Sequence, residues 1–134
     1  MRDYQKSKVY KWENKVVGPW DSQLLTDNDE IQDFINFVWV NEGFQNPPRV
    51  KDARKNSRTA TGSRTEVVFP PESKKRWIIL HELSHSLNRI GYVECDRHGP
   101  NFVKIYVNLL EKHLYMNRLM LLYTLKESKI DIAF

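Results

Sequence analysis

One five-residue segment, His81-Glu82-Leu83-Ser84-His85, restricts the fold of this chain more than any other. On an α-helix, residues four positions apart lie on one face, about one turn from each other. His81 and His85 can therefore bind a single metal ion, and Glu82 can reach a water molecule beside it. The segment predicts a rigid helix, a third metal ligand from elsewhere in the chain, and a core that packs beneath both.

The residues around this segment favour a metal site over a chance match. A helix is expected over residues 73–90, with Ser73 as its N-cap and Gly91 as the residue that ends it. Apolar residues occupy most of its sides, which is typical of a buried central helix. Two solvated histidines are out of place in such a helix, and a β-rich segment directly precedes it.

The third ligand is expected in the loop that follows. A catalytic zinc ion takes three protein ligands and keeps one position for water. His98 lies thirteen residues after His85 and directly before Gly99-Pro100, at the start of the next expected helix. We expect His98 to be this ligand. Glu94 and Asp96 are the alternatives, because zinc also accepts carboxylates.

Glu82 is the expected general base of this site. It would accept a proton from the metal-activated water during attack on a carbonyl group, and pass it to the leaving amine. The side chain that stabilises the transition state usually comes from a nearby tyrosine, histidine or arginine, and the candidates are Tyr92, Arg97 and Tyr106. Cys95 is expected to be a small buried side chain.

Hydrophobic periodicity predicts four more helices and a small antiparallel sheet. The helices are expected over residues 3–17, 28–41, 100–114 and 117–127, and the strands over residues 49–53 and 65–69. The expected fold class is α+β, a compact single domain over residues 1–134 in which the small sheet packs on the central helix that carries His81 and His85.

Local sequence signals predict where two helices begin or end, and where His113 and the C-terminal residues lie. Gly18-Pro19 is expected to end the first helix. Thr26 or Asp27 is the expected N-cap of the second helix. His113 lies on the apolar face of its helix and is expected to be a core or half-buried histidine. The apolar tail over residues 130–134 is expected either to dock on the core or to contact a partner.

Composition is consistent with one folded domain inside a cell. The chain has 134 residues, 40% of them hydrophobic, and its single cysteine excludes an intramolecular disulfide, which favours the reducing cytoplasm. The polar N-terminus predicts no signal peptide, and no apolar run reaches the ~20 residues of a membrane span. The net charge is +4, with basic residues concentrated over residues 49–64. A solvated sheet face is the main interpretation, and contact with nucleic acid or an acidic substrate is the functional one.

The two histidine segments carry a family resemblance. HELSH followed by HGPNF over residues 98–102 resembles the SprT-like and related compact zincins. The chain is also similar to small metallohydrolases of actinobacteria and their phages, through its start (Asp3-Tyr4-Gln5-x-x-x-Val9-Tyr10-x-Trp12-Glu13) and its HGPxF segment. The resemblance covers most of residues 3–114. It implies a zincin fold, zinc on His81, His85 and His98, Glu82 as base, and a bacterial or phage origin.

These observations predict a zinc-dependent metallopeptidase that hydrolyses peptide bonds in a protein or peptide substrate. SprT-like proteases act on DNA-bound proteins, but the chain has no CxxC pair for a zinc ribbon, so that substrate is not carried over. The alternative is a non-catalytic, zinc-stabilised module that contacts nucleic acid or a host protein through residues 49–64. A third class is a non-peptide amidase. The strand that includes Glu66–Phe69 is expected to offer an exposed edge to an extended peptide.

Overall fold

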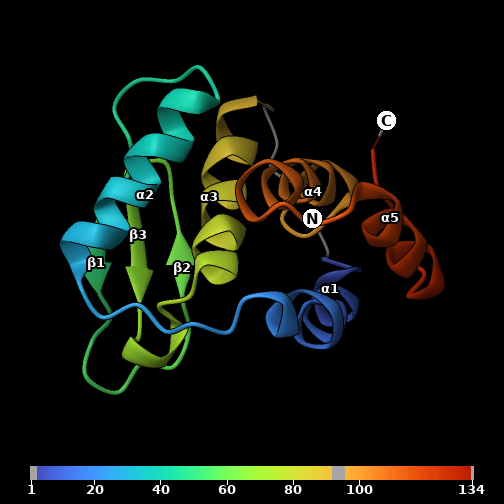
Figure 1. Cartoon of the computed structure of the whole chain (residues 1–134), viewed down its shortest axis with the longest axis horizontal. Coiled ribbons are helices and arrows are strands. Elements are labelled where there is room, and N and C mark those ends of the chain that lie inside the picture. Colours follow the sequence, from blue (N-terminus) through green and yellow to red (C-terminus); the bar gives the residue numbers. More distant parts are fainter. Residues whose placement is uncertain (1–2, 92–95, 134) are drawn as a thin grey trace.

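The computed structural model describes residues 3–91 and 96–133, and only the backbone of residues 89–91. The described chain holds five α-helices and one three-stranded sheet (Figure 1). The helices are α1 (Lys6–Trp12), α2 (Asn28–Asn41), α3 (Arg76–Gly91), α4 (Pro100–Leu114) and α5 (Arg118–Glu127). The strands are β1 (Arg49–Asp52), β2 (Thr61–Gly62) and β3 (Glu66–Phe69). The fold class is therefore α+β, as predicted.

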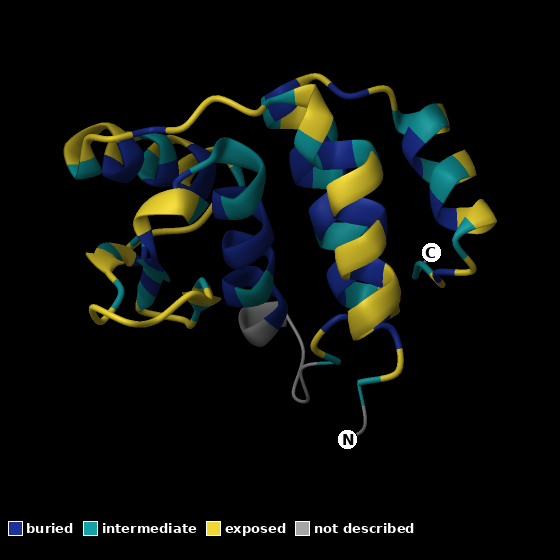
Figure 2. Ribbon diagram, turned by 90° about the horizontal axis from the view of Figure 1, so that it is seen from below, coloured by how far each residue is buried: buried dark blue, intermediate teal, exposed yellow. Residues whose placement is uncertain are grey.

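Helix α3 is the centre of the molecule. The sheet and α2 lie on one side of it, and α1, α4 and α5 lie on the other (Figure 1). Ile79, Leu80 and Leu83 are fully buried, and Figure 2 shows α3 buried along most of its described length. This confirms the prediction of a buried central helix, and it gives residues 81–85 a rigid support.

The start of α3 differs from the prediction. Ser73 does not cap it, because residues Pro71–Ser73 form a separate 3₁₀ turn. The first helical hydrogen bond runs from the backbone N–H of Ile79 to the carbonyl of Lys75. Two consecutive prolines, Pro70 and Pro71, favour the extended entry and the tight turn, so the helix begins later than its capping signal suggests.

The sheet is mixed, with strand order β1-β3-β2. Strand β2 pairs antiparallel to β3, but β1 runs parallel to β3, with Val50 opposite Val67. The prediction of a purely antiparallel sheet was therefore wrong. A two-residue strand, β2, reverses the chain between β1 and β3, and two residues are too few to show an alternating pattern. Strand β3 is paired on both sides, so the prediction of an exposed edge at Glu66–Phe69 was also wrong.

The edge strand beside α3 is β2, and a glycine permits that contact. A Cβ atom on Gly62 would lie 2.4 Å from the carbonyl oxygen of Glu82, which is closer than real Cβ contacts allow. The hydroxyl of Ser86 also donates to the carbonyl oxygen of Ser63 at 2.5 Å. Together these contacts fix β2 against residues 82–86 of α3.

The N-terminal helical run begins and ends three residues later than predicted. Helix α1 continues as a π-helical segment, Glu13–Val17, and then as a 3₁₀ turn, Gly18–Trp20. Gly18-Pro19 thus tightens the helix without ending it, because proline is tolerated in the first turn of a new helical segment. π-Helical segments are rare in proteins, and those that occur often lie at functional sites.

The other helices end close to the predicted residues. Asp27 caps α2 by accepting a hydrogen bond from the backbone N–H of Asp29 at 2.8 Å. The side chain of His113 is only 4% exposed, as predicted. The C-terminal tail docks on the core, because Ile130 is buried and the N–H of Ala133 donates to the carbonyl of Pro100. No described helix has the length and apolar character needed to cross a membrane.

Candidate metal centre

Three histidine side chains converge on one point. His81 and His85 come from α3, and His98 comes from the turn before α4. The Nε2 atom of His81 lies 3.2 Å from that of His85 and 3.3 Å from that of His98. Tetrahedral zinc with Zn–N bonds of about 2.0–2.1 Å separates its nitrogen ligands by about 3.3 Å. The three predicted ligands are therefore together, at the spacing a metal ion needs.

Two carboxylates determine which histidine nitrogens face this point. Glu13 Oε2 lies 2.7 Å from Nδ1 of His81, and Asp3 Oδ2 lies 2.8 Å from Nδ1 of His98. A carboxylate accepts hydrogen bonds, so each Nδ1 carries the hydrogen and the neutral ring presents a lone pair at Nε2. Lone pairs that face each other repel. A cation at their meeting point removes this repulsion, so the donor set fits a metal ion.

Electrostatics also favours a positive charge at this point. Burial alone would lower the pKa of His81, but the charge and hydrogen bond of Glu13, together with the charge of Glu82, outweigh burial and raise that pKa above its ordinary value. Burial lowers the pKa of His98, which favours its neutral, metal-binding form. The buried pair of Glu13 and His81 thus stabilises one positive charge, which a proton or a metal ion can supply.

Tyr106 supports Glu13 from behind. Its hydroxyl donates to Glu13 Oε2 at 2.8 Å, and its side chain is 1% exposed. The prediction that Tyr106 stabilises a transition state is therefore corrected, because its hydroxyl is buried and its hydrogen bond is used by Glu13. Its physical role is to hold the carboxylate that orients His81.

The turn that carries His98 is built around Asp96. The Asp96 carboxylate accepts hydrogen bonds from the backbone N–H of Asn101 at 2.7 Å and from the side chain of Asn88 at 2.8 Å. It therefore caps α4 and is not a metal ligand, which removes one alternative to His98. A Cβ atom on Gly99 would lie 2.8 Å from this carboxylate, which explains the glycine after His98.

Phe102, the aromatic residue of the HGPNF segment over residues 98–102, also has a structural role. Phe102 stacks on the ring of His85, with ring centroids 4.4 Å apart. It lies one turn into α4 and fixes the orientation of the second ligand. The predicted candidates Glu94, Cys95 and Tyr92 lie outside the described residues.

Glu82 lies beside the three histidines at the floor of an open groove. It lines both adjoining hollows of this groove, whose volumes are about 430 and 490 Å³. Burial raises the pKa of Glu82 to about 7, the charge of His81 opposes the rise, and that of Glu13 adds to it. A carboxyl group with this pKa can both accept and donate a proton near neutral pH.

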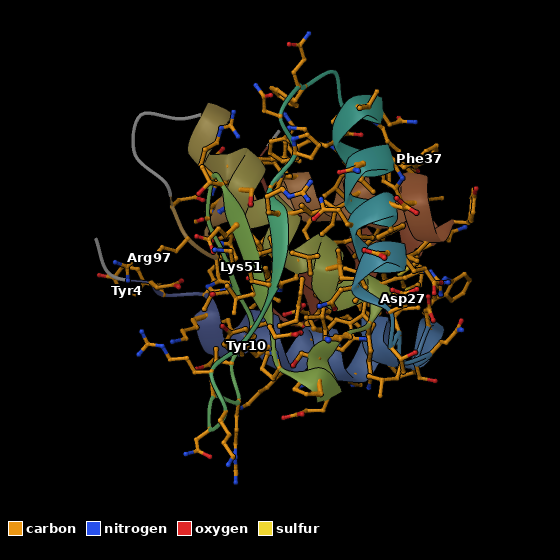
Figure 3. All side chains as sticks on the ribbon, turned by 90° about the vertical axis from the view of Figure 1, so that its left-hand side faces the viewer. Tyr4, Tyr10, Asp27, Phe37, Lys51 and Arg97 are labelled. Atoms are coloured by element: carbon orange, nitrogen blue, oxygen red, sulfur yellow. The ribbon has the colours of Figure 1, made fainter. Side chains whose placement is uncertain are left out.

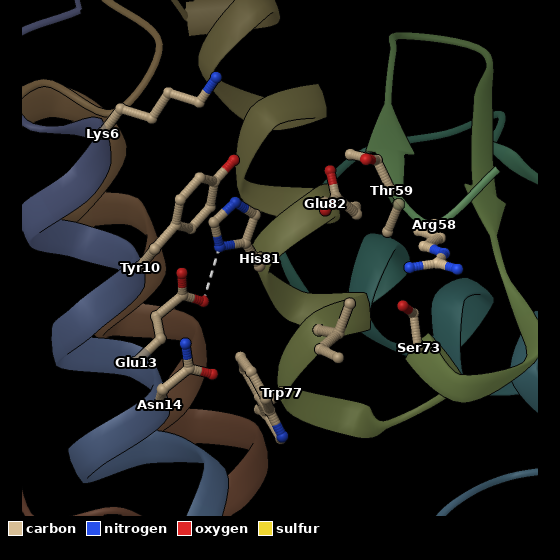
Figure 4. A pocket seen from close by; sticks show the side chains of 12 residues that line it. Lys6, Tyr10, Glu13, Asn14, Arg58, Thr59, Ser73, Trp77, His81 and Glu82 are labelled. Carbon is tan, nitrogen blue, oxygen red and sulfur yellow. Dashed lines mark hydrogen bonds and ion pairs between the residues drawn. The ribbon is translucent and has the colours of Figure 1, made fainter.

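The groove has two walls from distant parts of the sequence. Helix α1 forms one wall, and residues 58–62 form the other (Figure 4). Six residues line both hollows: Lys6, Tyr10, Thr59, Ala60, His81 and Glu82. The predicted candidate Arg97 lines one of them, is exposed, and lies at the outer margin of the molecule (Figure 3).

Tyr10 is the side chain of this groove that the sequence did not single out. Its ring stacks on His81 with centroids 5.9 Å apart, and its hydroxyl points into the groove (Figure 4). Burial, and then the charges of Glu82, Glu13 and Asp3, raise its pKa to about 12, so the hydroxyl keeps its proton. Tyr10 and Glu13 are three positions apart and share one face of the helical run, which is the signal that could have linked these two residues.

The chain matches no protein-family model, no curated protein and no solved structure. Its function is therefore inferred from the residues of the site.

Proposed function

We propose that this chain is a zinc-dependent metallopeptidase of the compact zincin type. The observation that carries the proposal is the convergence of three Nε2 atoms beside Glu82, at the floor of an open groove. Zinc held by His81, His85 and His98 would lower the pKa of a water molecule and polarise a substrate carbonyl group. Within the described residues the ligand cluster consists of these three histidines, which leaves one tetrahedral position for water or substrate.

The remaining side chains have separable roles in this proposal. Glu82 accepts a proton from the attacking water and returns it to the leaving amine, for which a pKa of about 7 is suited. Tyr10 donates its hydroxyl hydrogen to the carbonyl oxygen of the substrate, where negative charge develops. Glu13 and Asp3 hold the rings of His81 and His98 in the orientation that directs Nε2 inward.

The edge strand β2 suits a peptide backbone. Thr61 and Gly62 line the groove, and on the described chain β2 is paired to β3 alone. An extended peptide can add to such an edge through main-chain hydrogen bonds, which would bring its backbone past Glu82. This is the strand addition expected from the sequence, moved from β3 to β2.

Metal analysis of the purified protein tests the zinc site. We expect about one zinc per chain in the wild type, and loss of zinc in His81→Ala and in His98→Ala. His113→Ala is the matched control, since this histidine lies outside the cluster and should leave zinc in place. Wild-type protein without zinc, purified in the absence of chelators, would contradict the proposal.

Peptide hydrolysis tests the chemistry. Glu82→Gln should keep zinc and lose cleavage of a dye-labelled unfolded protein such as casein, because the amide cannot accept the proton. The alternative, a zinc-stabilised binding module, draws support from the exposed basic residues over 49–64. That alternative predicts no zinc-dependent cleavage by the wild type, and a closed zinc site with a fourth protein ligand.

A further inference from the structure

Two cationic side chains face each other across the groove. Lys6 projects from α1 and Arg58 from the opposite wall, with His81 and Glu82 between them (Figure 4). Across the described part of the chain, neither side chain has a hydrogen-bond or ion-pair partner. A long cationic side chain that is unpaired beside a reactive site is available to a ligand.

Arg58 differs in this respect from other basic residues nearby. Lys51 forms an ion pair with Glu66 at 3.1 Å, and the guanidinium of Arg64 lies over the ring of Trp39. Both side chains lie outside the groove lining, whereas Arg58 is part of it. Lys51 and Arg64 are thus held by partners outside the groove, whereas Arg58 faces the site.

The acidic groups of the groove do not neutralise these two cations. Glu13 and Asp3 are held in hydrogen bonds to the imidazole rings of His81 and His98. Glu82 is buried, with only 6% of its surface exposed, at the floor of the groove between the two cationic walls. A bound divalent cation would add further positive charge. The walls of the groove therefore present a positive surface to whatever binds there.

We propose that the ligand of this groove is an acidic peptide, with carboxylate side chains on both sides of the bond that is cut. The inference rests on the proposed peptidase function. Lys6 would pair with an acidic residue on one side of the scissile bond, and Arg58 with one on the other side. A backbone added to β2 runs between these two walls, so its side chains reach both.

A peptide fits the groove better than a nucleic acid does. Single-stranded nucleic acids bind through exposed aromatic faces that stack on bases, together with a row of cations along the backbone. In the described lining, one face of Tyr10 already packs on His81, and Trp77 packs against the core. The two unpaired cations stand on opposite walls and do not form a row.

A pair of peptides tests the proposal. They share length and central sequence, and their flanking residues are glutamate in one and glutamine in the other. We expect the wild type to have a kcat/KM for the acidic peptide that is about tenfold above that for the neutral peptide. Lys6→Glu and Arg58→Glu should each lower this ratio by about fivefold at low salt. Lys11→Glu on the same helix and Arg54→Glu in the same loop are matched controls, exposed and outside the lining.

Binding gives a second readout that does not depend on turnover. The zinc-loaded Glu82→Gln protein is titrated with the dye-labelled acidic peptide, and fluorescence anisotropy is recorded. The proposal is supported if the acidic peptide binds more tightly than the neutral one and if Lys6→Glu and Arg58→Glu each weaken that binding. If this holds and no peptide is cut, the proposed peptidase function is wrong and the proposed ligand stands. Equal binding of both peptides overturns it. A single-stranded oligonucleotide that binds through these two residues, when the acidic peptide does not, overturns it in favour of nucleic acid.

Discussion

The carboxylate of Glu13 lies 2.7 Å from Nδ1 of His81, although the two residues are 68 positions apart in the sequence. Glu13 opens the π-helical segment that follows α1, and His81 lies in the middle of α3. The same carboxylate oxygen accepts a hydrogen bond from the hydroxyl of Tyr106, which lies on α4. Three helical segments thus meet at one buried carboxylate, so the orientation of the His81 ring depends on how all three pack.

We therefore expect Glu13→Gln to weaken zinc binding by about tenfold to a hundredfold, because the amide still fits but no longer stabilises the positive charge. Competition with a chelator of known affinity measures this. Tyr106→Phe should weaken zinc binding less, since the carboxylate remains. Glu30→Gln, at an exposed position of α2, is the control. A zinc affinity equal to that of the wild type in Glu13→Gln would remove this carboxylate from the site.

Zinc should stabilise the folded chain. The ion binds the folded arrangement of His81, His85 and His98, so free zinc at a thousand times its dissociation constant adds about 4 kcal/mol to the free energy of unfolding. Thermal unfolding followed by circular dichroism, with and without zinc, measures the shift. His98→Ala should abolish the shift and His113→Ala should retain it. An equal shift in His98→Ala would mean that zinc binds elsewhere.

Gly62→Ala tests the contact between β2 and α3. The new Cβ would lie 2.4 Å from the carbonyl oxygen of Glu82, so the strand must move away from the helix. We expect a loss of about 1–3 kcal/mol in the free energy of unfolding, measured with urea, and slower peptide cleavage. Gly43→Ala is the comparison, since Gly43 has φ +88° and nothing within 4 Å of its Cβ position. It should cost about 1 kcal/mol through backbone strain and leave cleavage unchanged.

The sequence predicted the elements that carry strong local signals. Helix α2 has the predicted bounds because its apolar period and its cap at Asp27 agree. Helix α4 also has its predicted bounds, because Gly99-Pro100 is a strong signal for the start of a helix. The three histidines were predicted because two are linked by helical spacing and the third by a short loop. All of these signals act over a few residues.

What the sequence did not show depends on contacts between distant segments. Asp3 and His98 are 95 positions apart, and no local pattern links them. Strand β2 has only two residues, too few for a sequence pattern. Its contact with α3 leaves one trace in the sequence, which is Gly62, where a Cβ atom would clash with the backbone of Glu82. The parallel pairing of β1 with β3 follows from that short strand. Tertiary packing decides each of these features.

His113 lies outside the histidine cluster, and its titration should make the stability of the folded chain depend on pH. Burial lowers its pKa, the carboxylate of Glu42 opposes this at 3.7 Å, and the charge of Lys112 adds to it. Phe37 packs edge-on against the ring. The folded chain thus binds fewer protons at His113 than the unfolded chain does. Its contribution to stability is complete above the unfolded pKa of about 6.5 and is lost as the pH falls through the lower folded pKa.

The difference in the free energy of unfolding between the wild type and His113→Gln should therefore grow in favour of the wild type as the pH rises from about 5 to about 8. Urea unfolding at several pH values measures it, and subtracting the variant cancels titrations elsewhere, including that of Glu82. A difference that is independent of pH would show that His113 titrates alike in the folded and unfolded chains.

Tyr10→Phe tests the hydroxyl that points into the groove. The ring that stacks on His81 is kept, so zinc affinity and KM should change little. Loss of a hydrogen-bond donor to the developing negative charge should lower kcat by about a hundredfold. Tyr123→Phe, at an exposed position on α5, is the matched control and should leave kcat unchanged. If kcat is unaffected in Tyr10→Phe, the donor is another group, and Arg97 at the margin of the groove is then the described residue to test.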